Sequence, residues 1–136
     1  EIRLSLVGSE MCIRDSNYPH IDYTASDIDM LAAIIECEAG NQSYEGKCAV
    51  GSVIINRVRN PRFANTIQEA IFAPGQFSPV ASGRFAIVLA RGADSACVEA
   101  ATAVLNGYIN VDCLYFHAYR GSIDDDKLII GDHVFF

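Results

Sequence analysis

Apolar and polar positions along this chain follow a helical spacing first and a strand spacing later. Over residues 27–38 the apolar positions recur three to four residues apart, which predicts an amphipathic helix. Ser26 and the acidic residues after it favour a start there, through a hydroxyl cap and the helix dipole. The pattern stops at residues 39–41, where the sequence Ala-Gly-Asn predicts the end of the helix.

A second helix is predicted over residues 44–59. Ser43 offers a hydroxyl cap at its start, and the Asn60–Pro61 pair ends it because proline restricts the residue before it. The segment is apolar on nearly every side. We therefore expect it to be the central buried helix.

Shorter elements occupy the middle of the chain. Thr66 caps a short helix that runs through Phe72, and Pro74–Gly75 makes a turn. Another helix starts at residues 94–95 and ends at Gly107, a residue that suits the backbone beyond a helix C-terminus. These segments add to the helical part of the fold.

The last part of the chain has the two-residue period of strands. The predicted strands are Cys113–Tyr119, Lys127–Ile130 and His133–Phe136. A tight turn at Gly131–Asp132 returns the chain into the last of them. Helices first and a small sheet last define an α+β fold, a helical core with a small C-terminal antiparallel β-sheet.

The first sixteen residues share neither pattern nor turn chemistry with the rest. Leu6–Ser16 resembles the in-frame translation of a transposon-type sequencing adapter, and Glu1–Ile2 fits the outer end of that adapter. We therefore interpret residues 1–16 as translated adapter and residues 17–136 as the protein domain, with a genuine amphipathic arm as the alternative. On this interpretation a signal or anchor would precede Asn17.

Composition narrows the class of protein. The 136 residues are 51% apolar, and 10 Lys and Arg stand against 17 Asp and Glu, a formal net charge of −7. The apolar fraction argues against disorder, and no apolar run approaches the length of about 18 residues that spans a membrane. Because an acidic chain is a poor candidate for binding nucleic acid, we expect a globular, monomeric domain that acts on a neutral or small partner.

Four cysteines lie beyond residue 16. They are Cys37, Cys48, Cys97 and Cys113. None has the spacing of a zinc site, so no metal is expected, and the plain interpretation is four buried small side chains. A Cys37–Cys48 disulfide stays an alternative that spacing does not decide.

One carboxylate of the first helix falls on its apolar face. On a helical wheel Glu36 joins Asp29 on the polar stripe, whereas Glu38 falls among the apolar residues. Burial and the negative end of the helix dipole both raise the pKa of a carboxyl placed there, and so favour the protonated form that a general acid needs. The alternative is a terminal glutamate that turns to solvent or pairs with Arg57 or Arg59.

Several motifs occur in a fixed order. They are LAAIIECEAGNQSYEGKCAVGSVIINRVRNPRFANTI, PGQFSPVASGRF, LYF and, at the C-terminus, IGDHVFF. In this order they resemble the cell wall hydrolase family typified by the spore cortex-lytic enzyme SleB, over nearly all of residues 27–136. The resemblance implies that residues 17–136 form a lysozyme-like catalytic domain that needs no cofactor. It also implies cleavage of peptidoglycan glycan strands outside the cytoplasm, in the cell wall or spore cortex.

The resemblance assigns the family's catalytic glutamate, the first residue of a helix-terminal Glu-Ala or Glu-Ser pair, to Glu38. Glu38 would protonate the β-1,4 oxygen between N-acetylmuramic acid and N-acetylglucosamine. Attack by the muramoyl 6-hydroxyl then gives an anhydro sugar, and attack by water gives hydrolysis; the sequence leaves both open. Glu45 has a helix-start explanation and Asp124–Asp126 that of a solvated loop, so one catalytic carboxylate is expected.

Substrate contacts are expected on a loop and at a strand. Gln76, Phe77 and Ser78 follow a turn, and their amide, ring and hydroxyl match N-acetyl groups, sugar faces and sugar hydroxyls. Core filling is the alternative for Phe77. Tyr115 alternates with Phe116, so only one faces the core, and the resemblance implies that Tyr115 lines the cleft.

Other polar residues have plainer explanations. His133 is interpreted as a hydrogen-bonded sheet histidine, and Asn56 and Arg57 as partners of buried backbone groups, with a place in the cleft as their alternative.

Two other functions stay as hypotheses. One is a non-catalytic glycan-binding module of the same fold. The other is a peptidase that pairs Cys37 or Cys48 with His117 or His133, which is disfavoured because Cys37 lies near a helix C-terminus, where the field opposes a thiolate.

Overall fold

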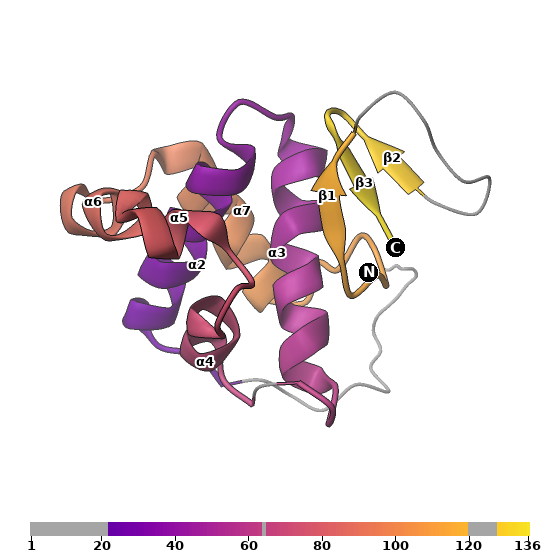
Figure 1. Ribbon diagram of the computed structural model, residues 1–136, viewed down its shortest axis with the longest axis horizontal. Coiled ribbons are helices and arrows are strands. Elements are labelled where there is room, and N and C mark those ends of the chain that lie inside the picture. The colour runs from indigo at the N-terminus through magenta and orange to yellow at the C-terminus, as the bar shows by residue number, and fades with distance from the viewer. Residues whose placement is uncertain (1–21, 64, 120–127) are drawn as a thin grey trace.

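Residues 22–63, 65–119 and 128–136 are described by the computed structural model. The proposed adapter segment 1–16 and the acidic run Asp124–Asp126 lie outside these residues. Within the described ranges, six helices precede a three-stranded antiparallel sheet (Figure 1). The predicted α+β architecture is therefore confirmed.

Helix α2 (Ala25–Ala39) carries Glu38 near its C-terminal end. Its cap is Thr24, whose hydroxyl accepts from the Asp27 amide at 3.2 Å while the Asp27 carboxylate accepts from the Thr24 amide at 2.9 Å. The prediction of Ser26 as the cap is wrong because the helix already begins at Ala25, and it is Thr24 and Asp27 that form this reciprocal pair.

Helix α3 (Tyr44–Arg59) has the predicted bounds and is capped by Ser43, whose hydroxyl accepts from the Gly46 amide at 3.2 Å. It crosses the middle of the molecule in Figure 1, with the sheet on one side and the smaller helices on the other. A Cβ at Gly51 would lie 2.9 Å from a methyl group of Val104 in α7. The glycine thus lets α7 pack closely against α3, as the central position predicted for this helix requires.

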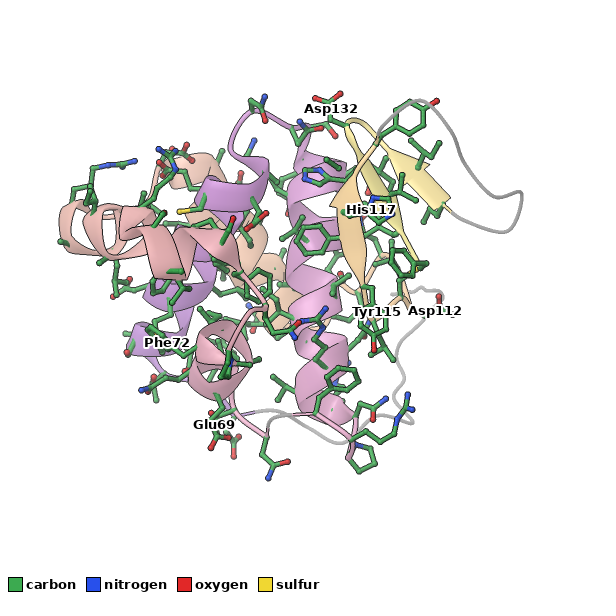
Figure 2. All side chains as sticks on the ribbon, in the orientation of Figure 1. Glu69, Phe72, Asp112, Tyr115, His117 and Asp132 are labelled. Carbon is green, nitrogen blue, oxygen red and sulfur yellow. The ribbon has the colours of Figure 1, made fainter. Side chains whose placement is uncertain are left out.

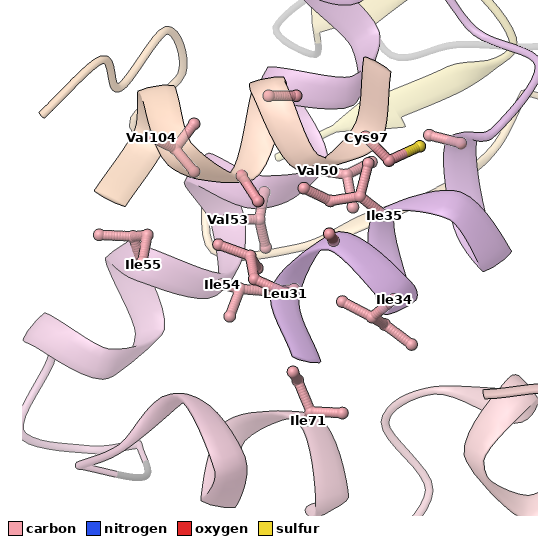
Figure 3. Close-up of a cluster of buried hydrophobic side chains, with 14 of the residues drawn as sticks. Leu31, Ile34, Ile35, Val50, Val53, Ile54, Ile55, Ile71, Cys97 and Val104 are labelled. Atoms are coloured by element: carbon pink, nitrogen blue, oxygen red, sulfur yellow. The ribbon is translucent and has the colours of Figure 1, made fainter. Parts of the chain in front are cut away.

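The core lies where α2, α3 and α7 (Ser95–Leu105) meet (Figure 3). Its largest fully buried aliphatic side chains are Leu31, Ile34, Ile35, Val50, Val53, Ile54, Ile55, Ile71 and Val88. Cys48 and Cys97 are also fully buried, as expected of small apolar side chains, whereas Cys37 and Cys113 are only half-buried, so the prediction of four buried cysteines is wrong for these two. No helix in the described ranges is long and apolar enough to cross a membrane.

Three short helices join α3 to α7. Helix α4 (Ile67–Phe72) starts at the Thr66 cap as predicted. Helices α5 (Ser78–Ser82) and α6 (Arg84–Arg91) were not predicted. Gly83, at φ 88°, separates them, and each is shorter than the window of about 11 residues over which an apolar period is usually recognised.

The sheet has the strand order β1 (Phe116–Ala118), β3 (His133–Phe135), β2 (Leu128–Ile130). Strands β1 and β3 are shorter than predicted, and Gly131, at φ 58°, makes the predicted turn. Gln42, in the α2–α3 loop, bonds to Asp132 of that turn twice, accepting from its amide at 3.0 Å and donating to its carboxylate at 2.9 Å. The loop after α2 is therefore fastened to the sheet.

Candidate active site

Glu38 lies half-buried in the last turn of α2. Burial raises the pKa of its carboxyl, in the direction predicted from the helical wheel. The alternative ion pair with Arg57 does not form, because the guanidinium of Arg57 donates to neutral oxygens elsewhere. The site therefore contains a carboxyl whose protonated form is favoured by its surroundings.

Glu36, two residues earlier in α2, does not face solvent as the wheel predicted. Its side chain is only 10% exposed, forms an ion pair with Arg91, and accepts from the Asp94 amide at 2.8 Å. The wheel prediction is wrong because the segment between α6 and α7 folds over this face of α2. An open polar pocket of about 300 Å³ lies beside it, between α2 and Arg84.

Glu36, Asp94 and Cys97 bring potential metal ligands within 4.8 Å of one another. Both carboxylates have structural partners: Glu36 the groups just named, and Asp94 the Cys97 amide, which donates to it at 2.9 Å as the cap of α7. The cluster is therefore explained by packing between α2, α6 and α7.

His133 links the sheet to the helix that carries Glu38. The imidazole, 8% exposed, forms a hydrogen bond with the backbone of Glu38, and burial lowers its pKa. Among the described residues its Nδ1 has no partner. The interpretation of His133 as a structural, hydrogen-bonded sheet histidine agrees with this position.

Of the three residues in the predicted substrate loop, two have exposed side chains and one has a buried side chain. Gln76, in the turn between α4 and α5, and Ser78, the first residue of α5, are both exposed. Phe77 is 6% exposed, and its ring centre lies 6.3 Å from that of Phe116. This position matches the core-filling alternative for Phe77.

Tyr115 and Phe116 alternate as predicted. Phe116 packs against the core, whereas Tyr115 is 42% exposed and stacks on Phe136, with ring centres 5.5 Å apart and planes at 20°. Figure 2 shows Tyr115 beside the beginning of β1 and His117 further along the same strand. His117 is also exposed. The chain therefore leaves the side chain of Tyr115 exposed at the start of β1.

Asn56 and Arg57 satisfy backbone carbonyls, as expected. The Asn56 amide donates to Val111 and Cys113 at 2.9 and 3.0 Å, and Arg57 Nε donates to Leu114 at 2.7 Å. The sequence did not predict that Arg57 also binds a residue of the substrate loop. The one available signal was a charged side chain within a helix that is otherwise buried.

Residues 41–136 match a family model described as Cell Wall Hydrolase. The chain belongs to this family. It is 33% identical over 95 residues to a spore cortex-lytic enzyme of Bacillus cereus, covering 70% of this chain and 35% of that protein. It is 39% identical over 62 residues to that of Bacillus subtilis, covering 46% of this chain and 20% of that protein. The chain thus spans about a third or less of the length of these relatives.

Two solved structures confirm the fold of this cell wall hydrolase domain. The catalytic domain of the germination-specific lytic transglycosylase SleB from Bacillus anthracis superposes with a TM-score of 0.72 at 28% identity, covering 83% of this chain and 95% of that one. The catalytic domain of Bacillus cereus SleB gives 0.73 at 27% identity, covering 90% and 97%. The predicted family resemblance is confirmed.

The cysteines of this cell wall hydrolase domain are thiols. All four in the described ranges are free, so the alternative Cys37–Cys48 disulfide is not formed. Burial raises the pKa of Cys48 and of Cys97 to about 12 in each case, and it also raises that of Cys37. A peptidase would need a thiolate, which this environment opposes.

Glu45 has a structural place in the domain. Its carboxylate accepts from the Tyr108 hydroxyl at 3.1 Å and from the Asn110 side-chain amide at 3.0 Å, in the first turn of α3. The position of Glu45 therefore agrees with a structural role at the start of the helix. Glu38 stays the candidate for proton transfer.

Proposed function

We propose that this domain cleaves the β-1,4 bond between N-acetylmuramic acid and N-acetylglucosamine in peptidoglycan, with Glu38 as both general acid and general base. The observation that carries this proposal is the half-buried carboxyl with a raised pKa at the end of α2. The fold shared with SleB catalytic domains supports it. The names of the relatives support a place of action outside the cytoplasm.

The proton transfers follow from a single carboxyl. Protonated Glu38 gives its proton to the glycosidic oxygen as the bond from that oxygen to the muramoyl C1 breaks. The resulting carboxylate then takes a proton from the muramoyl 6-hydroxyl while the oxygen of that hydroxyl bonds to C1. This step forms the anhydro sugar. Water in place of that hydroxyl gives hydrolysis by the same two transfers.

Exposed side chains offer the substrate contacts. The Gln76 amide and the Ser78 hydroxyl match the acetamido and hydroxyl groups of a glycan, and the exposed ring of Tyr115 matches a sugar face. Phe77 supports this surface from the core. These assignments extend the proposal from the reacting bond to the strand that contains it.

The test is release of muropeptides from purified sacculi by wild type and by Glu38→Gln. Removing the general acid should lower the rate about 10²- to 10⁴-fold without unfolding the protein. Glu99→Gln, on the exposed face of α7, is the matched control and should keep full activity. Unchanged release by Glu38→Gln would contradict the proposal, and wild type that binds sacculi without cleaving them would indicate a binding module. Mass analysis for anhydro or reducing muramic ends then separates transglycosylation from hydrolysis.

A further inference from the structure

Arg57 is a buried cation with neutral partners. It is 6% exposed, and it donates through Nε to the Leu114 carbonyl and through Nη1 to Gln76 Oε1, both at 2.7 Å. Among the described residues no carboxylate forms an ion pair with it. Burial lowers its pKa, but arginine stays protonated in proteins, so the charge is permanent.

Three aromatic rings surround the same guanidinium. Its Cζ lies 5.6 Å from the ring centre of Phe63, 5.8 Å from that of Phe77 and 5.2 Å from that of Tyr115. Distances of this size are typical of cation–π contacts. The rings belong to segments well separated along the chain. Arg57 therefore joins the end of α3, the α4–α5 turn and the entry to β1 at one point.

The bond to Arg57 decides which end of the Gln76 amide faces outward. Because a guanidinium donates and never accepts, Gln76 must turn its carbonyl oxygen toward Arg57. The NH2 group then points away, and no described residue accepts from it. The side chain is exposed, and its turn joins α4 to α5, both of which contact α2, the helix of Glu38.

We infer that Arg57 is a positioning residue that holds the Gln76 amide with its NH2 group toward the bound glycan, where it donates to the carbonyl oxygen of an N-acetyl group. This inference rests on the proposed function. An acetamido oxygen accepts and never donates, whereas a sugar hydroxyl does both. A group that offers only donors complements an oxygen that only accepts, and it leaves one of its own donors unpaired when that oxygen is missing.

The decisive variant is Gln76→Glu. It keeps an oxygen for Arg57, and adds a charge to that bond, so the fold is retained, but it replaces the outward donor with an acceptor. Binding is measured by calorimetry in the Glu38→Gln background, on peptide-free glycan fragments and on the same fragments after de-N-acetylation. Gln76→Glu should weaken binding of the acetylated fragments at least about tenfold. The same variant should bind the de-N-acetylated fragments more tightly than the acetylated ones, because the ammonium groups of the former donate to the new carboxylate.

Two further variants complete the test. Gln68→Glu, exposed on α4, adds the same charge elsewhere and should leave the preference for acetylated fragments unchanged. Arg57→Lys keeps the charge but loses the two-point attachment, so it should reduce that preference in protein that is still folded. A preference that Gln76→Glu does not change would overturn the inference. If Gln76→Glu weakens binding to whole sacculi but not to peptide-free fragments, the inference is also overturned, because the acceptor would then belong to the stem peptide.

Failure of this inference is distinct from failure of the proposed function. If wild type releases no muropeptides, the proposed function fails. If wild type is active but the acetyl preference does not depend on Gln76, only the role of Arg57 and Gln76 fails.

Discussion

The end of α2 and the end of α3 each bury a charged residue type, and they do so in opposite ways. At the end of α2, burial raises the pKa of Glu38 and so favours its neutral form. At the end of α3, Arg57 keeps its charge and surrounds it with carbonyl oxygens and aromatic rings. The first arrangement suits a group that must gain and lose a proton, and the second suits a group that must stay in one place.

The comparison predicts that removing the cation is costly. Arg57→Met deletes two charge-assisted hydrogen bonds and leaves the part-buried Leu114 carbonyl without this donor, so the free energy of unfolding should fall by about 2–3 kcal/mol. Urea denaturation followed by circular dichroism measures this. Arg62→Met, on an exposed arginine, is the control and should change the stability by less than about 0.5 kcal/mol. Equal stability of Arg57→Met and wild type would show that the cation does not hold these segments together.

A smaller effect is expected where the loop after α2 meets the sheet. Gln42→Ala removes both side-chain bonds from the loop after α2 to Asp132, which should cost about 1 kcal/mol because the bonds are exposed. Thermal unfolding measures this cost, and Gln68→Ala provides a control on an exposed glutamine without such bonds. If Gln42→Ala and wild type have the same melting temperature, the two bonds between the loop and the sheet contribute nothing to stability.

The smallest predicted effect is a gain in stability, whereas the two preceding variants lose stability. The folded state binds the Glu38 proton more tightly than the unfolded chain, whose carboxyl has the ordinary value of 4.5. The stability from the protonated form is thus complete below that pH and is lost as the pH rises through the raised folded pKa. Glu38→Gln has no charge to bury, so at pH 7 it should be more stable than wild type, by on the order of 0.5 kcal/mol after solvent screening.

Melting curves at several pH values check the sign of this effect. The gain of Glu38→Gln over wild type should disappear toward pH 4, where wild type is protonated as well. A variant that is less stable than wild type at pH 7 would mean that the Glu38 carboxylate has a favourable partner in the folded protein.

Features with a local cause could be predicted from the sequence. The Ser43 cap and the bounds of α3 depend on neighbours within one turn, and the apolar position of Glu38 follows from the same periodicity. Features that depend on distant segments could not be predicted. Glu36 is covered by the α6–α7 segment, and the Arg57–Gln76 bond joins residues 19 positions apart across two turns. The sequence around Glu36 and Arg57 does not indicate which distant segments contact them.

The strand order of the sheet also constrains the sequence of events during synthesis. Strand β3 is the central strand, yet it follows both of its neighbours in the chain. Neither β1 nor β2 therefore has its pairing partner until β3 has emerged from the ribosome, whereas α2, α3 and α7 are already complete by then. Tyr115, whose backbone pairs with Phe136, takes its position only at that stage. A nascent chain can thus contain a folded helical core that carries Glu38 before Tyr115 has reached its final position.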